Sequence, residues 1–359
     1  MARHDRNDLP PAVVYCAHCL DRTRGKTAHG LVRRSERFDV CAVVDPDHAG
    51  KDASDLVPGA APGIPIVSTL QEALAAGPDT GEWTFIVGLA TDGGVLPDHA
   101  REAVKEAIGN GMHVVSGLHV FLSEDPEIAP LARAAGVRLE DVRRPPDRKD
   151  LHFYQGRVRE IEAVRVLVLG TDCATGKRTT SWIIRDALID EGVAAEMIGT
   201  GQTAWMQGAR YSIVLDSLVN DFVAGELEHA MVSAWSETGA EVLIVEGQGA
   251  LLHPAYPGGL ELIAAVQPDV IVLQIAAGKD TFDGFPDLPL PPLERQIAAI
   301  EILADRPVDI LSVNPAGRLE PQRAWICGAL ERDFDRPVID IMRDGPGRIV
   351  EVIRGRMRS

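Results

Sequence analysis

The sequence predicts an α/β protein made of two doubly wound domains, and three observations carry this prediction. Short apolar runs alternate with helical stretches along the chain, as in parallel sheets covered by helices. At 359 residues, the chain exceeds the length at which single hydrophobic cores stop growing, about 250–300 residues. Near the middle, a charged and proline-bearing stretch without periodicity separates two such alternating halves. We therefore expect domains at 1–145 and 163–359, joined by a linker at 146–162.

Composition restricts the class of function. The balance of 36 Lys and Arg against 53 Asp and Glu gives a net charge of −17, which repels nucleic-acid phosphates and anionic membranes. We expect neither as a partner and favour a small-molecule substrate. The N-terminus has no apolar run long enough for a signal peptide or a membrane span, which indicates a cytoplasmic protein. A homo-oligomer is compatible with the sequence.

Five scattered cysteines favour reduced thiols over a disulfide framework. Cys16 and Cys19 have metal-ligand spacing, and His18 and Cys41 would complete a set of four ligands. A zinc site usually draws on a second closely spaced pair, which is missing here. Buried thiols are the favoured interpretation, and metal binding by these cysteines is left open.

The first half begins as a βαβ unit. An apolar run at 12–16, a basic loop at 21–30 and a second apolar run at 38–44 follow in order, but the first loop lacks the G-x-G-x-x-G pattern of dinucleotide sites. Lys26 and Arg33 belong to a dense basic cluster, which is either a solvated surface or a seat for an acidic small molecule. Further strands are expected at 64–67, 83–88 and 112–116.

His119 follows the last of these strands, at the edge of a parallel sheet where ligands usually bind. A purely structural histidine is the alternative interpretation.

The second half opens on the motif around which the chain is organised. Val166–Leu169 is apolar, a glycine-bounded loop follows, and an amphipathic helix is expected over 181–191. A Gly-Lys pair between a buried strand and a helix is typical of a phosphate-binding loop, where backbone N–H groups and a lysine charge hold the anion. The predicted phosphate or cofactor ligands in this loop are Gly170, Thr171, Asp172, Cys173, Ala174, Thr175, Gly176, Lys177, Arg178, Thr179 and Thr180.

Other candidate residues follow the remaining strands, expected at 194–198, 211–215, 242–245, 270–273 and 308–313. Glu246 comes directly after four buried aliphatic residues, as a Walker B acid does. Glu246, Asp216 and His253 are the candidate catalytic bases. Gln202 and Asn314 are added to the predicted cofactor ligands, and Gln248 to the substrate ligands Lys26, Arg33 and His119.

The chain resembles the D-glutamate N-acetyltransferase (DgcN-like) family. The resemblance rests on motifs spread over residues 14 to 315, and the phosphate loop alone also resembles that of dethiobiotin synthetase and its MinD-like relatives. These motifs are 26–31, 115–119, 170–180, 200–203, 220–225, 246–249 and 253–254. The family implies a Rossmann-like N-terminal domain, a C-terminal P-loop NTPase-like domain, and acetyl transfer from acetyl-CoA to the amino group of D-glutamate.

One departure from the ordinary P-loop weighs on the choice of ligand. Nucleoside triphosphatases place a magnesium-binding Ser or Thr after the loop lysine, whereas this chain has Arg178. Coenzyme A carries phosphates and binds without a metal, which favours acetyl-CoA. The alternative is an ATP- and magnesium-dependent carboxylate-activating ligase or kinase, in which Thr179, Asp216 and Glu246 would surround the ion. A nucleotide-binding regulatory protein without turnover is the third hypothesis.

Overall fold

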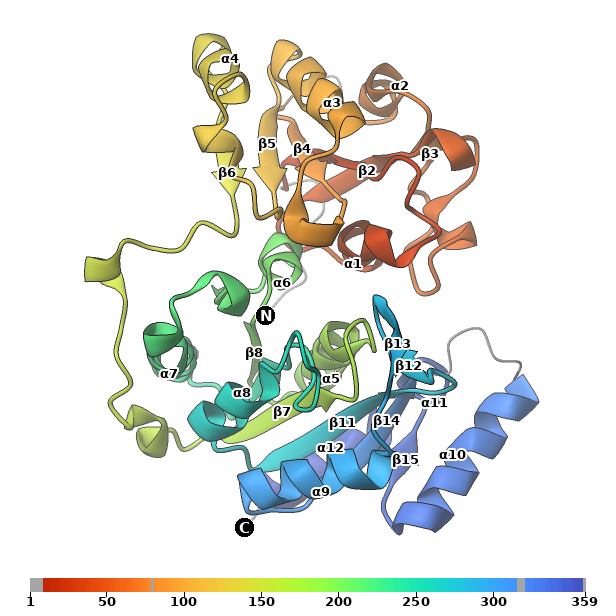
Figure 1. The fold of residues 1–359 in the computed structure, drawn as a ribbon, viewed down its shortest axis with the longest axis vertical. Coiled ribbons are helices and arrows are strands. Elements are labelled where there is room, and N and C mark those ends of the chain that lie inside the picture. Colours follow the sequence, from red (N-terminus) through yellow and green to blue (C-terminus); the bar gives the residue numbers. More distant parts are fainter. Residues whose placement is uncertain (1–8, 79–80, 315–319, 358–359) are drawn as a thin grey trace. The chain divides into compact units, whose positions relative to one another are not determined.

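The structure, a computed structural model, describes residues 9–78, 81–314 and 320–357. The chain divides into two compact units, which Figure 1 draws in one view. The first comprises residues 1–145 together with 202–209, and the second comprises residues 146–201 and 210–359. A short segment of the second half of the sequence therefore folds with the first unit.

The first unit contains a parallel sheet of six strands in the order β3-β2-β1-β4-β5-β6. This is the order of doubly wound dinucleotide-binding domains, in which β1 to β3 are added toward one edge of the sheet and β4 to β6 toward the other, so that the strand order switches between β1 and β4. The strands are β1 (Pro11–Tyr15), β2 (Asp39–Val44), β3 (Ile66–Val67), β4 (Thr84–Val87), β5 (His113–Ser116) and β6 (Leu139–Asp141). The helices are α1 (Lys26–Arg33), α2 (Leu70–Ala75), α3 (Asp98–Gly109), α4 (Ile128–Ala135) and α6 (Gln202–Gln207).

Helix α6 is held in the first unit by close packing and hydrogen bonds. The Gln207 amide donates to the carbonyl of Gly30 at 2.7 Å, and the Gln207 carbonyl accepts from the backbone N–H of Glu36 at 2.7 Å. A Cβ on Gly117 would lie 2.7 Å from the Cγ atom of Gln202, so the helix needs a glycine beneath it. These contacts fix α6 against α1 and the end of β5.

The second unit contains a parallel sheet of seven strands in the order β15-β14-β11-β7-β10-β8-β9. Its strands are β7 (Val164–Gly170), β8 (Ala195–Gly199), β9 (Tyr211–Ser212), β10 (Val242–Glu246), β11 (Val270–Ala276), β14 (Ile310–Asn314) and β15 (Val338–Ile339), and β12 (Thr281–Phe282) and β13 (Phe285–Pro289) form a separate hairpin. The helices are α5 (Lys177–Asp190), α7 (Asn220–Thr238), α8 (Gly259–Val266), α9 (Leu293–Ala304), α10 (Glu320–Phe334), α11 (Ile341–Asp344) and α12 (Gly347–Met357).

Both faces of this second sheet are buried, which explains why its strands are continuously apolar. On β7, Leu167 and Leu169 point into a core shared with α7, α8 and α9, whereas Val166 and Val168 point into a core shared with α5 and α12. The strand that leads into the phosphate loop is thus clamped from both sides. Its carboxyl end is flanked by Glu246 of β10 and Gln274 of β11 in the strand register.

The segment expected to be a linker is fastened to α7 of the second unit. The carboxylate of Glu226 accepts from the backbone N–H of His152 at 2.6 Å, and the carboxylate of Glu228 accepts from Gln155 and Val158. The imidazole of His152 also stacks on that of His229, with 3.7 Å between the ring centroids. This part of the chain therefore has a defined course along the helix.

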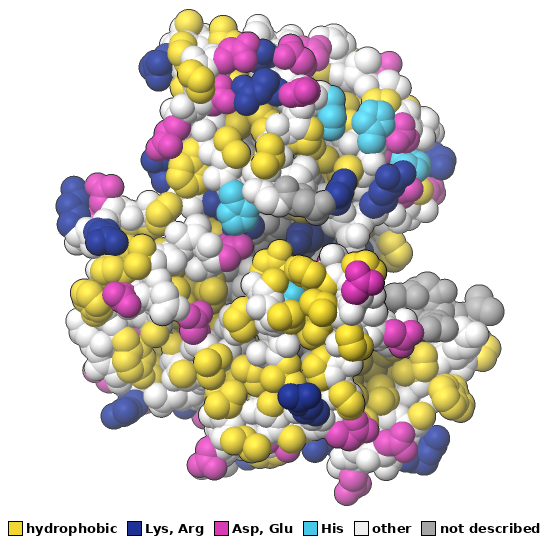
Figure 2. All heavy atoms as spheres, in the orientation of Figure 1, with side chains coloured by type: hydrophobic (Ala, Val, Ile, Leu, Met, Phe, Trp, Pro, Cys, Tyr) yellow, Lys and Arg dark blue, Asp and Glu magenta, His cyan; other side chains and the backbone are white. Residues whose placement is uncertain are grey.

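The surface of the second unit carries exposed apolar side chains. Figure 2 shows hydrophobic side chains gathered over α8 and α9, where Leu260, Ile302 and Leu303 are 49%, 79% and 47% exposed. Such a patch is compatible with the possible homo-oligomer, which stays a prediction. Within the part of the chain that the structure describes, no helix has the length and apolar character needed to cross a bilayer.

Candidate functional site

The predicted phosphate loop lies between β7 and α5, and its backbone is shaped by two residues of positive φ. Ala174 has φ of 54° and Gly176 has φ of 108°, after which α5 begins at Lys177. The side-chain amide of Asn314 donates to the carbonyl of Thr175 at 3.0 Å and braces the loop from β14. The loop thus leads into the N-terminus of a helix, where free N–H groups and the helix dipole favour an anion.

Lys177 lies at the centre of this loop. Its ammonium donates to the carbonyls of Asp172 and Gly249, both at 2.8 Å, and the residue is only 7% exposed. Two glycines make room for its stem. A Cβ on Gly247 would lie 2.1 Å from the carbonyl oxygen of Val168 and 3.0 Å from Cδ of Lys177, and one on Gly170 would lie 3.0 Å from the Lys177 nitrogen.

Glu246 and Arg178 carry opposite charges and lie close enough to affect each other's pKa. The Glu246 carboxylate accepts from the backbone N–H of Thr200 at 3.1 Å, and the Thr200 hydroxyl donates to the Glu246 carbonyl at 3.0 Å. Burial raises the pKa of Glu246 above its usual value, although Arg178, the Thr200 N–H and Lys177 all oppose the rise. Burial likewise lowers the pKa of Arg178, which Glu246 opposes. A carboxylate with a raised pKa can take a proton closer to neutral pH.

The hydroxyls after the loop are arranged differently from those of an ordinary magnesium site. Thr180 is buried, and its hydroxyl donates to the side-chain oxygen of Gln274 at 2.6 Å. Thr179 is half-buried on the first turn of α5. Arg178 occupies the position at which nucleoside triphosphatases carry the metal-binding hydroxyl.

Asp172 ties the loop to the β12–β13 hairpin. Its fully buried carboxylate accepts from the Lys279 ammonium at 2.6 Å, from the backbone N–H of Asp283 at 2.9 Å, and from the backbone N–H of Cys173 at 2.7 Å. Lys279 also lies 3.2 Å from the Asp283 carboxylate. Because Lys279 neutralises Asp172, the acid does not repel an anion in the loop as strongly as an isolated carboxylate would.

His253 lies near the Asp172 carboxylate and is surrounded by aromatic side chains. Its Nδ1 accepts from the backbone N–H groups of Ala255 and Tyr256, both at 3.1 Å, so hydrogen bonding assigns the proton of the neutral ring to Nε2. That Nε2 is buried without a hydrogen-bond partner among the described residues and lies 3.7 Å from an oxygen of Asp172. The rings of Tyr256, Phe282 and Phe285 surround it.

This environment decides the chemistry of His253. Burial lowers its pKa, with Asp172 opposing. In this arrangement, the neutral ring offers an N–H donor rather than a lone pair. A base role for His253 stays a prediction, and it requires the ring to exchange its two backbone donors for another orientation.

Several predicted residues lie apart from this cluster. Asp216 is exposed on a short helical turn, Leu215–Ser217, and Gln248 is half-buried in the loop after β10. Gln202 starts α6 in the first unit. Lys26 and His119 are exposed in the first unit, and the Arg33 side chain donates to the carbonyl of Pro58 at 2.8 Å. Their predicted roles in substrate and cofactor binding stay predictions.

Two sets of side chains among the described residues could hold a metal ion, and the set of Cys16, Cys19, Cys41 and His18, for which the sequence leaves metal binding open, is not one of them. Within each of the two sets, the ligand atoms lie within 4.8 Å of one another. Burial raises the pKa of Cys41 to about 11 and that of Cys16 well above its usual value, so both thiols are protonated near neutral pH when no metal is bound. The two sets are Asp172, Cys173 and His253, and His18, Asp45 and Asp47.

Lys279 and Asp283 are the site residues that sequence reasoning missed. Both follow β11, the strand beside β7, so charged residues after a buried strand were the available signal. Their partner Asp172 is more than 100 positions earlier, and spacing along the chain does not reveal such a pair.

The fold and this site define a class of protein, a two-domain α/β protein that combines a Rossmann-like domain with a P-loop domain. A family model described as "Domain of unknown function (DUF1611_C) P-loop domain" matches residues 152–350, and one described as "Domain of unknown function (DUF1611_N) Rossmann-like domain" matches residues 46–145. The chain belongs to the DUF1611 family.

Relatives and one solved structure agree with this assignment. A D-glutamate N-acetyltransferase from Pseudoalteromonas sp. is 33% identical over 276 residues, which are 75% of this chain and 81% of the relative. A D-glutamate N-acetyltransferase from Tritonibacter scottomollicae is 30% identical over 319 residues, or 86% and 90% of the two chains. The crystal structure of a DUF1611 family protein from Anabaena variabilis superposes with a TM-score of 0.87 at 30% identity, and covers 96% of this chain and 99% of that one.

Proposed function

We propose that this protein is an acetyltransferase that moves the acetyl group of acetyl-CoA to the amino group of an acidic amino acid such as D-glutamate. The names of the two relatives support the acetyltransferase role. Each alignment covers most of this chain and most of the relative. The observation that carries the choice of acetyl-CoA is the replacement of the magnesium-binding hydroxyl by Arg178 in an otherwise well-formed phosphate loop. An arginine beside Lys177 suits the phosphates of coenzyme A, which need no metal.

The residues fit the phosphates of such a ligand. Lys177, Arg178 and the backbone N–H groups at the start of α5 would hold them, and Asn314 and Gln274 would keep the loop in shape. Lys279, paired with Asp172 at 2.6 Å, would reduce the repulsion between that carboxylate and a bound phosphate. Acetyl-CoA supplies the thioester whose carbonyl carbon accepts the amine.

The transfer needs a base and an oxyanion donor. The amine must lose a proton before it forms the bond to the acetyl carbon, after which the carbon–sulfur bond breaks and the thiol leaves. We assign the base role to Glu246, because its raised pKa suits proton uptake near neutral pH. Backbone N–H groups of 247–249 are the donors for the oxyanion, and the Nε2–H of His253 is a further candidate donor.

The alternative is an ATP- and magnesium-dependent ligase or kinase. One observation favours it, the position of Glu246 at the end of β10, directly beside the P-loop strand, as a Walker B acid lies. Arg178 and the engagement of the Thr180 hydroxyl by Gln274 favour acetyl-CoA instead.

Two measurements on the full chain separate these proposals. Release of CoA thiol from acetyl-CoA, followed with a thiol reagent, is expected to depend on D-glutamate. Thermal unfolding is expected to shift upward with acetyl-CoA, because a ligand stabilises the state that binds it. A shift with Mg–ATP alone, together with amino-acid-dependent ADP formation, would replace the acetyltransferase by the ligase or kinase.

A further inference from the structure

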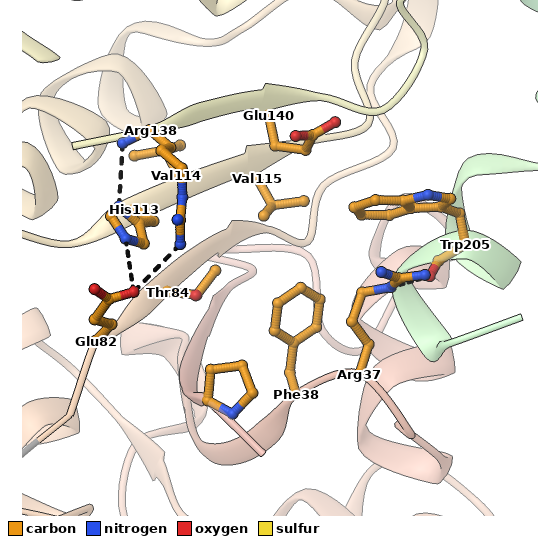
Figure 3. Close-up of a pocket in the computed structure, with 11 residues that line it drawn as sticks. Arg37, Phe38, Glu82, Thr84, His113, Val114, Val115, Arg138, Glu140 and Trp205 are labelled. Carbon is orange, nitrogen blue, oxygen red and sulfur yellow. Dashed lines mark hydrogen bonds and ion pairs between the residues drawn. The ribbon is translucent and has the colours of Figure 1, made fainter. Parts of the chain in front are cut away.

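A second candidate site lies in the first unit, in a hollow of about 210 Å³ on one face of its sheet (Figure 3). Thr84 and His113, the first residues of β4 and β5, line it. The hollow therefore lies toward the amino ends of the strands, whereas doubly wound folds bind their usual ligands at the carboxyl ends. Its volume is below the range of about 300–1,000 Å³ that is usual for larger ligands, which restricts an occupant to a small molecule.

Arg37 is held in an orientation in which it can bind a carboxylate in this hollow. Its Nε donates to the carbonyl of Trp205 at 2.7 Å, and its guanidinium carbon lies 4.0 Å from the centre of the Trp205 ring. Burial lowers the pKa of Arg37. Among the residues that the structure describes, its two terminal nitrogens have neither a hydrogen bond nor an ion pair. The guanidinium of Arg37 is thus held in one orientation, and both of its terminal nitrogens can donate to a ligand.

Glu140 supplies the opposite charge. It is exposed on β6, it favours the charged form of Arg37, and within the described residues it makes no hydrogen bond or ion pair. The other charged groups of the hollow are already engaged. Glu82 accepts from Arg138 at 3.3 Å and lies 3.4 Å from Nε2 of His113, as the dashed lines in Figure 3 mark.

The remaining wall is apolar. Phe38 and Val115 are 7% and 5% exposed and lie between the charged groups in Figure 3. The two arginines and two glutamates that line the hollow cancel in formal charge. A ligand with a single charge would satisfy either Arg37 or Glu140 and meet the other as a like charge, whereas a zwitterion satisfies both.

We propose that this hollow binds a zwitterionic α-amino acid with an apolar side chain. The ligand's carboxylate pairs with the terminal nitrogens of Arg37, its ammonium pairs with Glu140, and its side chain packs on Phe38 and Val115. The site is separate from the phosphate loop and does not depend on the proposed acetyltransferase activity.

Isothermal titration calorimetry of the full-length protein tests the proposal. L-Valine and D-valine are compared with isovalerate (3-methylbutanoate), which lacks only the ammonium, and isobutylamine, which lacks only the carboxylate. At least one valine enantiomer is expected to bind, with each singly charged analogue weaker by about tenfold or more. Absence of binding by both enantiomers at millimolar concentration, or equal affinity for an analogue, would overturn the proposal.

Variants locate the binding. Arg37→Met and Glu140→Gln are each expected to weaken valine about tenfold or more. Glu140 is exposed, so its substitution tests the site even if Arg37→Met impairs folding. Arg133→Met, at an exposed arginine on α4 of the same unit, is the matched control and should leave valine binding unchanged. Equal binding by Glu140→Gln and the wild type, or an equal loss of binding in Arg133→Met, contradicts the assignment.

Discussion

Replacing Arg178 by methionine tests whether Arg178 and Glu246 form a buried charge pair behind the phosphate loop. Glu246 is 5% exposed and Arg178 Nε is shielded from solvent, so the variant leaves a carboxylate in a poorly solvated site. Removing one partner of a buried pair costs about 3–5 kcal/mol. The Thr200 N–H and Lys177 remain to stabilise Glu246, so we expect the lower end, about 3 kcal/mol, or about 6–12 °C in the unfolding midpoint.

The loss depends on pH in a defined direction. The pKa of Glu246 in the folded protein is raised above 4.5, so the folded protein binds this proton more tightly than the unfolded chain does. The folded protein therefore loses stability as pH rises through that raised pKa. Without Arg178 the pKa rises further. The part of the difference that comes from the Glu246 charge is therefore largest above the raised pKa and is lost below about pH 4.5, where Glu246 is neutral in both folded and unfolded chains.

Thermal unfolding of the full chain at pH 5 and pH 8, followed by circular dichroism, measures this difference. Arg178→Lys keeps the charge and is the matched control, with a smaller loss expected at pH 8. If Glu246 is the base, the acidic limb of the activity profile also moves to higher pH in Arg178→Met. Equal losses at both pH values would refute a charge pair and leave only lost packing.

Three further predictions concern the same site. Lys177→Met should weaken acetyl-CoA by about 10- to 150-fold, the worth of a charge-assisted hydrogen bond, as measured by calorimetry. Gly247→Ala should lower stability by about 1–3 kcal/mol through its clash with the Val168 carbonyl, whereas Gly109→Ala on α3, with open space around it, should not; equal unfolding midpoints would contradict the packing argument. Because burial holds the pKa of His253 below 6.5, the wild type should lose stability as pH falls below 6.5, and His253→Phe should lack that component.

The parts of the site that the sequence predicts are those built from neighbours along the chain. The phosphate loop, its helix and Glu246 depend on a buried strand followed by a characteristic turn, and the structure has both strands as expected. Lys279 and the donor orientation of His253 depend on a hairpin folding back onto Asp172, which local patterns do not encode. The fold class is confirmed, because alternating apolar runs report parallel sheets directly.

The exchange of α6 between the halves of the sequence limits how the chain can be divided. A fragment that ends before residue 146 would keep all six strands of the first sheet. It would lose α6, which packs against α1 and against Gly117. The complementary fragment would carry α6 without its packing partners. Modules exchanged between relatives at the middle of the chain would therefore have to match at two places, the boundary near 146 and the segment 202–209. Each unit is therefore discontinuous in the sequence, because residues 202–209 belong to the first unit and the residues on either side of them belong to the second.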